Sequence, residues 1–211
     1  QLADALEHPY NATIEHIRGQ DVAHADETGW PKGNRQKGWL WALCCATAAV
    51  FMVHAERGQE AAKKLLGMFG GTLVSDRWGG YNFFCGVRQI CWAHLKRDFK
   101  AISEANGAIG KIGQELYGLA KQILKMRSRV RDGTLQWRTF QNRMEPLEKR
   151  VEELLEEGAC GNGALSGKCR MIIKHREHLW TFVHDQSVEP TNNAAERVVR
   201  QGVLWRKGSF G

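Results

Sequence analysis

The spacing of hydrophobic and polar positions in the first half of the chain predicts short strands and two helices. Five segments rich in branched apolar residues have the composition of strands. They are residues 21–26, 39–46, 49–54, 72–76 and 87–91. The first three follow one another so closely that we expect an antiparallel meander. Residues 58–69 and 93–102 instead place apolar side chains three and four positions apart, which is the period of an amphipathic helix.

The middle of the chain carries two longer helical patterns. Apolar residues recur in steps of four and three over residues 112–130, and again over residues 137–154. Two such stripes on either side of a turn at Gly133 predict an antiparallel helical hairpin. Because proline removes a backbone donor, the second arm is expected to kink or restart at Pro146.

The two ends of the chain are predicted to be helical. Residues 2–17 predict a helix broken at Pro9, residues 169–183 predict a further helix, and a last helix begins near Asn192. Three strands followed by helices and further strands is the order of an RNase H-like domain, an α/β fold whose mixed sheet is flanked by helices. We therefore expect four parts, and the last of them carries Glu196. They are an N-terminal helical lead-in (1–20), the first part of the RNase H-like core (21–105), an all-helical hairpin insertion (106–160) and the C-terminal part of the core (161–211).

Charge and composition narrow the class of protein. The 30 Lys and Arg residues exceed the 23 Asp and Glu residues and give a net charge of +7. This balance favours a polyanion such as nucleic acid as the partner, but many proteins without such a partner share it. The longest apolar run, residues 40–53, is too short to span a bilayer. No signal peptide is present, so we expect a cytoplasmic protein with six reduced cysteines. From its first and last residues, we also expect the chain to be a fragment truncated at both ends.

Three acidic residues are the main candidates for chemistry. Asp26 and Asp76 follow apolar strand segments, and Glu196 lies near the start of the last helix. Carboxylates from neighbouring strands and a helix can hold the two divalent ions that phosphoryl transfer uses. Strand alternation places Asp26 on the face of His24 and Glu27 on the other face, so Asp26 is the candidate of the pair. Glu27 is expected to shape the turn that follows.

Each acid also has a plain structural explanation. Asp26 and Asp76 are equally suited to ending a strand and capping a turn. The pattern from Asn193 to Glu196 fits a capping box, in which Glu196 only satisfies a backbone N–H. Spacing alone leaves these alternatives open.

Four motifs in one order decide between them by resemblance. They are His24-Ala-Asp-Glu-Thr-Gly-Trp30, Val74-Ser-Asp76 with Tyr81, Cys91-Trp-Ala-His-Leu-Lys-Arg97 and Asn192-Asn-Ala-Ala-Glu-Arg197. Together they resemble the transposases of the bacterial insertion-sequence sixty-six family, over residues 22–207. The resemblance implies a DDE-type RNase H-like core interrupted by a helical insertion before the final acid. It makes Asp26, Asp76 and Glu196 the catalytic triad, with Mg²⁺ or Mn²⁺ as cofactor and two ions expected.

Further residues are assigned supporting roles. Cys91 and His94 have the spacing of part of a zinc site, but the ligand set is incomplete and no zinc is expected. By resemblance, His94 lies near the scissile phosphate or braces the site; a hydrogen-bonded histidine at a strand–helix junction is the alternative. Asn192 and Asn193 position water or backbone, or only cap the helix. The expected DNA-binding residues are Lys96, Arg97, Arg197, Arg200, Arg206 and Lys207.

The function expected from the sequence is transposition of DNA. It comprises metal-dependent cleavage at the ends of the element and attack of the freed 3′-OH on target DNA. The partners are therefore the element's ends and target DNA, with a homo-oligomer in the active complex, near the bacterial nucleoid and away from membranes. Two alternatives stay open: an RNase H-like nuclease without strand transfer, and an inactive remnant that only binds DNA.

Overall fold

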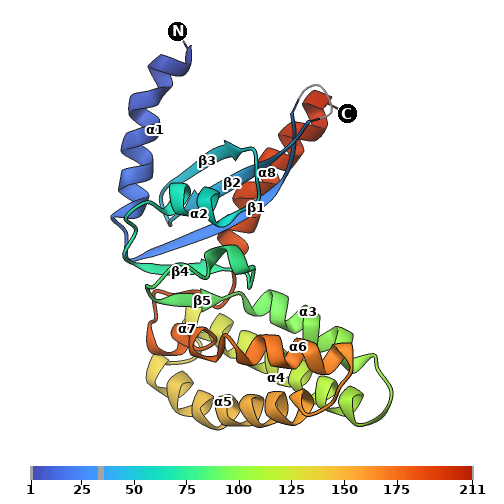
Figure 1. Cartoon of the computed structure of the whole chain (residues 1–211). Helices are drawn as coiled ribbons and strands as arrows, with labels where there is room; N and C mark the ends of the chain where they lie inside the picture. Colours follow the sequence, from blue (N-terminus) through green and yellow to red (C-terminus); the bar gives the residue numbers. More distant parts are fainter. Residues whose placement is uncertain (1, 33–35, 211) are drawn as a thin grey trace. The chain divides into compact units, whose positions relative to one another are not determined.

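The chain forms two compact units in the computed structural model, which describes residues 2–32 and 36–210. The first, here the sheet unit, comprises residues 1–88 and 191–211. The second, the helical unit, comprises residues 89–190 (Figure 1). The helical unit therefore lies in the sequence between two segments that belong to the sheet unit.

The described residues form an α/β fold with a five-stranded mixed sheet, as expected. The strand order is β3-β2-β1-β4-β5. The strands are β1 (Val22–Lys32), β2 (Gln36–Cys44), β3 (Ala49–His54), β4 (Thr72–Ser75) and β5 (Arg88–Ile90). The first three pair antiparallel, which confirms the predicted meander, whereas β1 and β4 pair parallel. The long connection from β3 to β4 supplies the crossover that a parallel pair requires.

Strand β1 is much longer than predicted. It continues past Asp26 and pairs with β2 as far as Lys32, so the turn expected after Asp26 is wrong. The predicted turn residues Gly33 and Asn34 lie outside the described residues. In the described ladder, β1 pairs with β4 only from Val22 to His24. Beyond His24, β1 pairs with β2 alone in the described ladder. The missing backbone N–H of Pro31 therefore removes no hydrogen bond to a second neighbouring strand.

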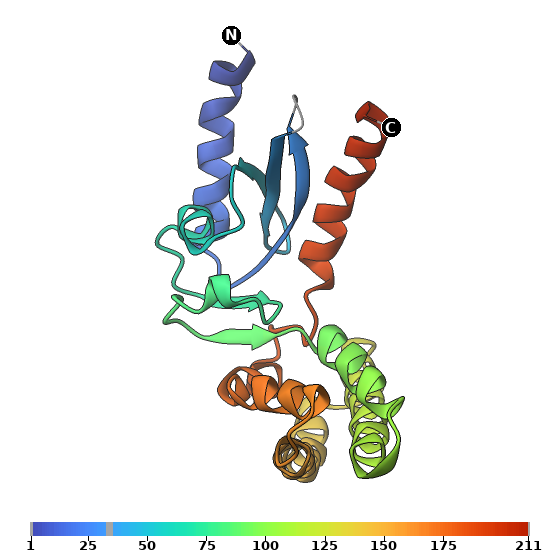
Figure 2. The same cartoon turned by 45° about the vertical axis from the view of Figure 1, so that its right-hand side comes forward.

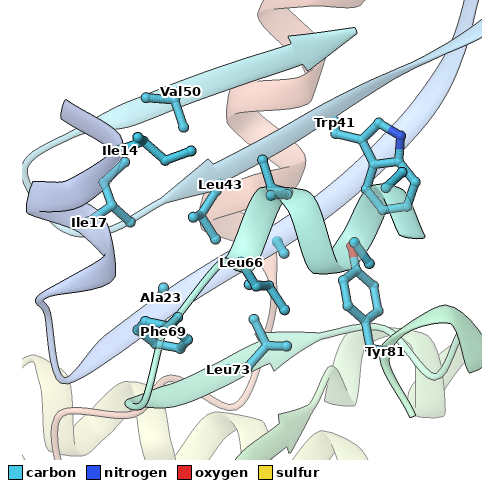
Figure 3. Close-up of a cluster of buried hydrophobic side chains, with 14 residues drawn as sticks. Ile14, Ile17, Ala23, Trp41, Leu43, Val50, Leu66, Phe69, Leu73 and Tyr81 are labelled. Carbon is cyan, nitrogen blue, oxygen red and sulfur yellow. The ribbon is translucent and has the colours of Figure 1, made fainter. Parts of the chain in front are cut away.

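The two faces of this sheet are covered by different helices. Helices α1 (Leu2–Arg18) and α2 (Gln59–Leu66) pack on one face, and α8 (Asn193–Phe210) packs on the other (Figure 2). Side chains from α1, α2 and the strands fill the first interface. Figure 3 shows this core, which includes Ile14, Ile17, Ala23, Trp41, Leu43, Leu66, Phe69, Leu73 and Tyr81. Alternate residues of β1 therefore point either into this core or toward α8.

The sequence predicted a break in helix α1 at Pro9, but the helix is continuous there. The helix runs through this residue, whose own surface is exposed. A backbone group that loses its helical partner on an exposed face can bond water instead. The hydroxyl of Thr13 also donates to the carbonyl of Pro9 at 2.7 Å.

The helical unit contains the predicted hairpin. Its long arms are α4 (Gly107–Arg131) and α5 (Trp137–Ala159), which pack together through the two apolar stripes. Gly133 in the connection has φ of +79°, a left-handed conformation that glycine adopts without strain. Helix α5 runs through Pro146 without restarting.

The single helix predicted for residues 169–183 is wrong. Helix α6 (Ala164–Ile173) ends early and is followed by the 3-10 turn η2 (Arg176–His178) and the short α7 (Thr181–His184). The carbonyl of Leu179 accepts bonds from the indole of Trp92 at 2.7 Å and the amide of Gln89 at 3.1 Å. These tertiary bonds stabilise the non-helical backbone. Trp92 is the first residue of α3 (Trp92–Ser103), and α3 packs on α4.

In the part of the chain that the structure describes, every helix is too short or too polar to span a membrane.

Candidate active site

The strand register pairs β1 with β4 in the residues that lead up to Asp26 and Asp76. His24 is opposite Val74 in the parallel pair of β1 and β4. Asp26 lies two residues after His24, and Asp76 lies two residues after Val74. Residues at the same level of parallel strands point to the same face. Continued by two residues, this register would place Asp26 and Asp76 on one side of the sheet, at the carboxyl end of β4, which is where ligands bind in open α/β sheets.

Helix α8 lies on this face and brings the third acid. Asn192, the fully buried residue before α8, donates its side-chain amide to the carbonyl of Ala25 at 2.8 Å. Its side-chain oxygen lies 3.2 Å from Nδ1 of His24, which assigns the proton to that ring nitrogen. These two bonds fasten the start of α8 to β1. Glu196 follows in the first turn of α8, and its backbone N–H donates to the carbonyl of Asn192 at 3.1 Å.

The charges of Asp76 and Glu196 act on the carboxyl group of Asp26. The pKa of Asp26 is raised to about 7, chiefly by burial and also by the charges of Glu27, Asp76 and Glu196, against a backbone N–H that lowers it. Asp76 has one carboxylate oxygen accepting the backbone N–H of Trp78 at 2.9 Å. A half-buried group of like charges is stabilised by a cation. Carboxylate oxygens are the ligands of hard divalent cations, so Asp26, Asp76 and Glu196 are of the residue types that could hold Mg²⁺ or Mn²⁺.

Glu27 has a different environment from its neighbour Asp26. It lies opposite Trp41 on the core face of β1, and only 1% of its side chain is exposed. Its carboxylate accepts bonds from Nε of Arg57 at 2.9 Å and from the hydroxyl of Tyr81 at 2.9 Å. The prediction that Glu27 shapes a turn is therefore wrong. Its carboxylate is already bound by protein donors on the face away from Asp26.

Sequence reasoning missed Arg88, which lies beside the end of β4. The residue is only 2% exposed, and its guanidinium donates to the hydroxyl of Ser75 at 3.1 Å and to the carbonyl of Asp76 at 3.4 Å. Burial lowers the pKa of Arg88, while the charge of Asp76 raises it. The signal in the sequence was a single charge inside an apolar strand segment. A buried charge of this kind is rare unless it is paired.

The basic residues of α8 are placed differently from one another. Arg197, Arg200 and Lys207 are exposed and available to a ligand. Arg206 is half-buried and donates to the backbone carbonyl of Gly29, so it ties the end of α8 to β1. Asn193 is exposed at the first position of the helix. The binding of DNA by these residues stays a prediction.

The remaining predicted residues belong to the helical unit. Cys91 is buried immediately before α3, and its carbonyl accepts the backbone N–H groups of His94 at 3.1 Å and Leu95 at 3.3 Å. Lys96 is half-buried and Arg97 is exposed in the same helix. Their roles beside the three acids of the sheet unit stay a prediction.

Comparison with known proteins identifies the family. The chain belongs to the Transposase IS66 family, whose model matches residues 1–211. It is 25% identical to the uncharacterized protein y4qI of Sinorhizobium fredii, over 93% of this chain and 42% of that protein. It is also 25% identical to y4jD of the same organism, over 95% of this chain and 45% of that protein. The chain thus spans less than half the length of these relatives. No solved structure matches it.

Proposed function

We propose that this chain is the catalytic region of a DDE-type transposase with an RNase H-like core. The proposal depends chiefly on one observation: Asp26 and Asp76 each follow by two residues the paired residues His24 and Val74 of β1 and β4. Glu196 lies in the first turn of α8, which packs on β1 and supports the same grouping. Membership of a transposase family supports the same assignment. In this proposal, residues 106–160 are a helical insertion into the chain of the core before Glu196.

The three acids would hold the divalent ions on which this chemistry depends. Asp26, Asp76 and Glu196 supply oxygen ligands, and two ions of Mg²⁺ or Mn²⁺ are expected. Such ions, when bound, activate the attacking oxygen and stabilise the leaving oxygen of a phosphodiester. The side chains of Asn192 and His24 fasten the start of α8 to β1, which supports Glu196 as the third ligand of the proposed site.

The reaction proposed is hydrolysis at the ends of the element, followed by attack of the freed 3′-OH on target DNA. Water and the 3′-OH are the nucleophiles, so no covalent bond between protein and DNA is formed. Exposed arginines of α8, Arg197 and Arg200, and the basic residues Lys96 and Arg97 of α3 would bind backbone phosphates. Such contacts orient a duplex without reading its sequence.

We propose that the activity of the whole transposase needs regions outside this chain. Because the chain spans less than half of its relatives, recognition of specific ends is proposed to need other regions. Cleaving and joining two ends requires two sites, so we propose a homo-oligomer as the active form. The proposed location is the bacterial cytoplasm, in association with the nucleoid.

The test is strand cleavage and joining by the full-length protein on duplex DNA that carries the element's end. Asp26→Asn, Asp76→Asn and Glu196→Gln are each expected to reduce both products to background in the presence of Mg²⁺. Glu157→Gln, at an exposed position of α5, is the matched control and should retain activity. Unchanged cleavage in the aspartate variants would contradict the proposal. Cleavage by the unaltered protein without any joined product would favour the nuclease instead.

A further inference from the structure

The core face of β1 carries a cluster of polar and aromatic side chains directly behind Asp26. Glu27 is at its centre, with the guanidinium of Arg57 2.8 Å from one carboxylate oxygen and the Tyr81 hydroxyl 2.9 Å from the other. The guanidinium also lies over the rings of Trp39 and Trp78, at 5.1 and 4.7 Å from their centroids. Tyr81 is fully buried. Burial raises its pKa well above the usual value, which keeps the hydroxyl a donor.

This cluster links the two segments that carry the proposed catalytic aspartates. Glu27 follows Asp26 directly in β1. Tyr81 ends the short turn η1 (Gly79–Tyr81), which follows Asp76. The bond from Tyr81 to Glu27 therefore joins β1 to the segment after β4, at the level where their direct pairing has ended.

Trp78 connects the same cluster to the carboxylate of Asp76. Its backbone N–H donates to that carboxylate, and its indole packs against the rings of Tyr81 and Trp41, both at 5.6 Å. The turn also requires glycine at position 80, since a Cβ there would lie 1.9 Å from the Trp78 ring. The position of the Asp76 carboxylate thus depends on where the cluster holds Trp78.

We propose that Glu27, Arg57 and Tyr81 form a positioning cluster that sets the separation of the Asp26 and Asp76 carboxylates. None of the three is proposed to touch DNA or metal. The inference rests on the proposed function, because it assigns the two aspartates to a shared metal site. Two bound donors hold Glu27 in one orientation, and charge-assisted bonds of this kind are the stronger class of hydrogen bond.

A purely structural cluster would stabilise the fold without affecting metal affinity. The two roles are separated by measuring Mn²⁺ binding to the full-length protein by electron paramagnetic resonance, alongside thermal unfolding. Tyr81→Phe removes only the hydroxyl and keeps the buried ring. It is expected to weaken Mn²⁺ binding about tenfold at temperatures where the variant is fully folded, as loss of groups that orient metal ligands does. Tyr117→Phe, at a half-exposed position of α4, is the matched control and should bind like the unaltered protein.

A second variant covers the case in which Tyr81→Phe does not fold. Arg57→Lys keeps the charge on the partly exposed partner but loses the planar fork, so a weaker change in the same direction is expected. Mn²⁺ affinity equal to that of the unaltered protein in every folded variant would overturn the positioning role. Failure of the proposed function gives a different result: the unaltered protein and Asp26→Asn would then bind Mn²⁺ equally.

Discussion

The buried side-chain amide of Asn192 donates to the carbonyl of Ala25, the residue immediately before Asp26, at 2.8 Å. The two residues are 167 positions apart in the sequence. This bond, together with the contact between Asn192 and His24, places the first turn of α8 against the middle of β1. The proximity of Glu196 to Asp26 therefore depends on an amide side chain that the sequence suggested only as a helix cap or a site residue.

Replacing Asn192 should disturb both stability and the site. Asn192→Ala leaves the buried carbonyl of Ala25 and the ring of His24 without this partner, and is expected to cost about 2–3 kcal/mol of unfolding free energy. Urea denaturation measures this cost. Cleavage assayed well below the unfolding transition should also fall, because Glu196 is no longer held. Asn142→Ala, at an exposed position of α5, is the control and should lower neither quantity appreciably. If the two variants had equal unfolding free energies and equal cleavage rates, this role of Asn192 would be contradicted.

Gly80 should tolerate no side chain. In Gly80→Ala, the added Cβ meets the ring of Trp78, which is itself held by Tyr81 and Arg57. Overpacking of this kind is expected to destabilise the protein by about 1–3 kcal/mol, read from its thermal unfolding. Gly118→Ala gives the matched control, since nothing lies within 4 Å of a Cβ at that exposed helical position. It should instead stabilise α4 by up to about 1 kcal/mol, so the two substitutions are expected to shift the transition in opposite directions.

The stability of the helical unit should depend on pH through Glu148. The pKa of Glu148 is raised from a usual value of 4.5 to about 7, chiefly by burial and also by the charges of Glu152 and Glu145. Between pH 4.5 and 7 the unfolded chain has already lost this proton while the folded chain retains it. Ionisation therefore favours unfolding, and this contribution to stability falls as the pH rises through that range and levels off above pH 7.

Glu148→Gln should remove this dependence. The variant is expected to be more stable than the unaltered protein by about 1–2 kcal/mol at pH 8, an amount reduced from the full shift because the side chain is partly exposed. At pH 4 the difference should vanish, since the glutamate is then protonated in both states. Urea denaturation at the two pH values measures it. Glu157→Gln, exposed in the same helix, should show no such gain, and a gain that is equal at both pH values would rule out titration as its cause.

Local patterns in the sequence located most of the helices and strands. The predicted range of β3 matches the observed strand, and the two apolar stripes of the hairpin became α4 and α5. These predictions succeeded because the preference of a segment for helix or strand depends on the spacing and type of residues that are near one another in sequence. Asp26, Asp76 and Glu196 were selected by their places beside strands and a helix, and by resemblance to a family.

The errors share one physical cause: contacts between distant residues outweighed local preference. Gly29 and Pro31 favour a turn, but pairing with β2 extends β1 through them. The apolar pattern of residues 169–183 favours one helix, but bonds from Trp92 and Gln89 to the carbonyl of Leu179 stabilise another backbone path. A single-sequence pattern contains no information about either partner.

The sequence by itself determined which side chains are available to the site, how the hairpin pairs and which stretches form strands. Tertiary structure alone decided that β1 and β4 pair just before Asp26 and Asp76, that Glu27 is bound on the core face of β1, and that Arg88 lies buried beside β4. Strand register and helix docking are set by packing and hydrogen bonds between segments that are remote in the chain. A carboxylate is therefore a candidate in the sequence, and becomes part of a site only when the fold determines which face it occupies and what lies beside it.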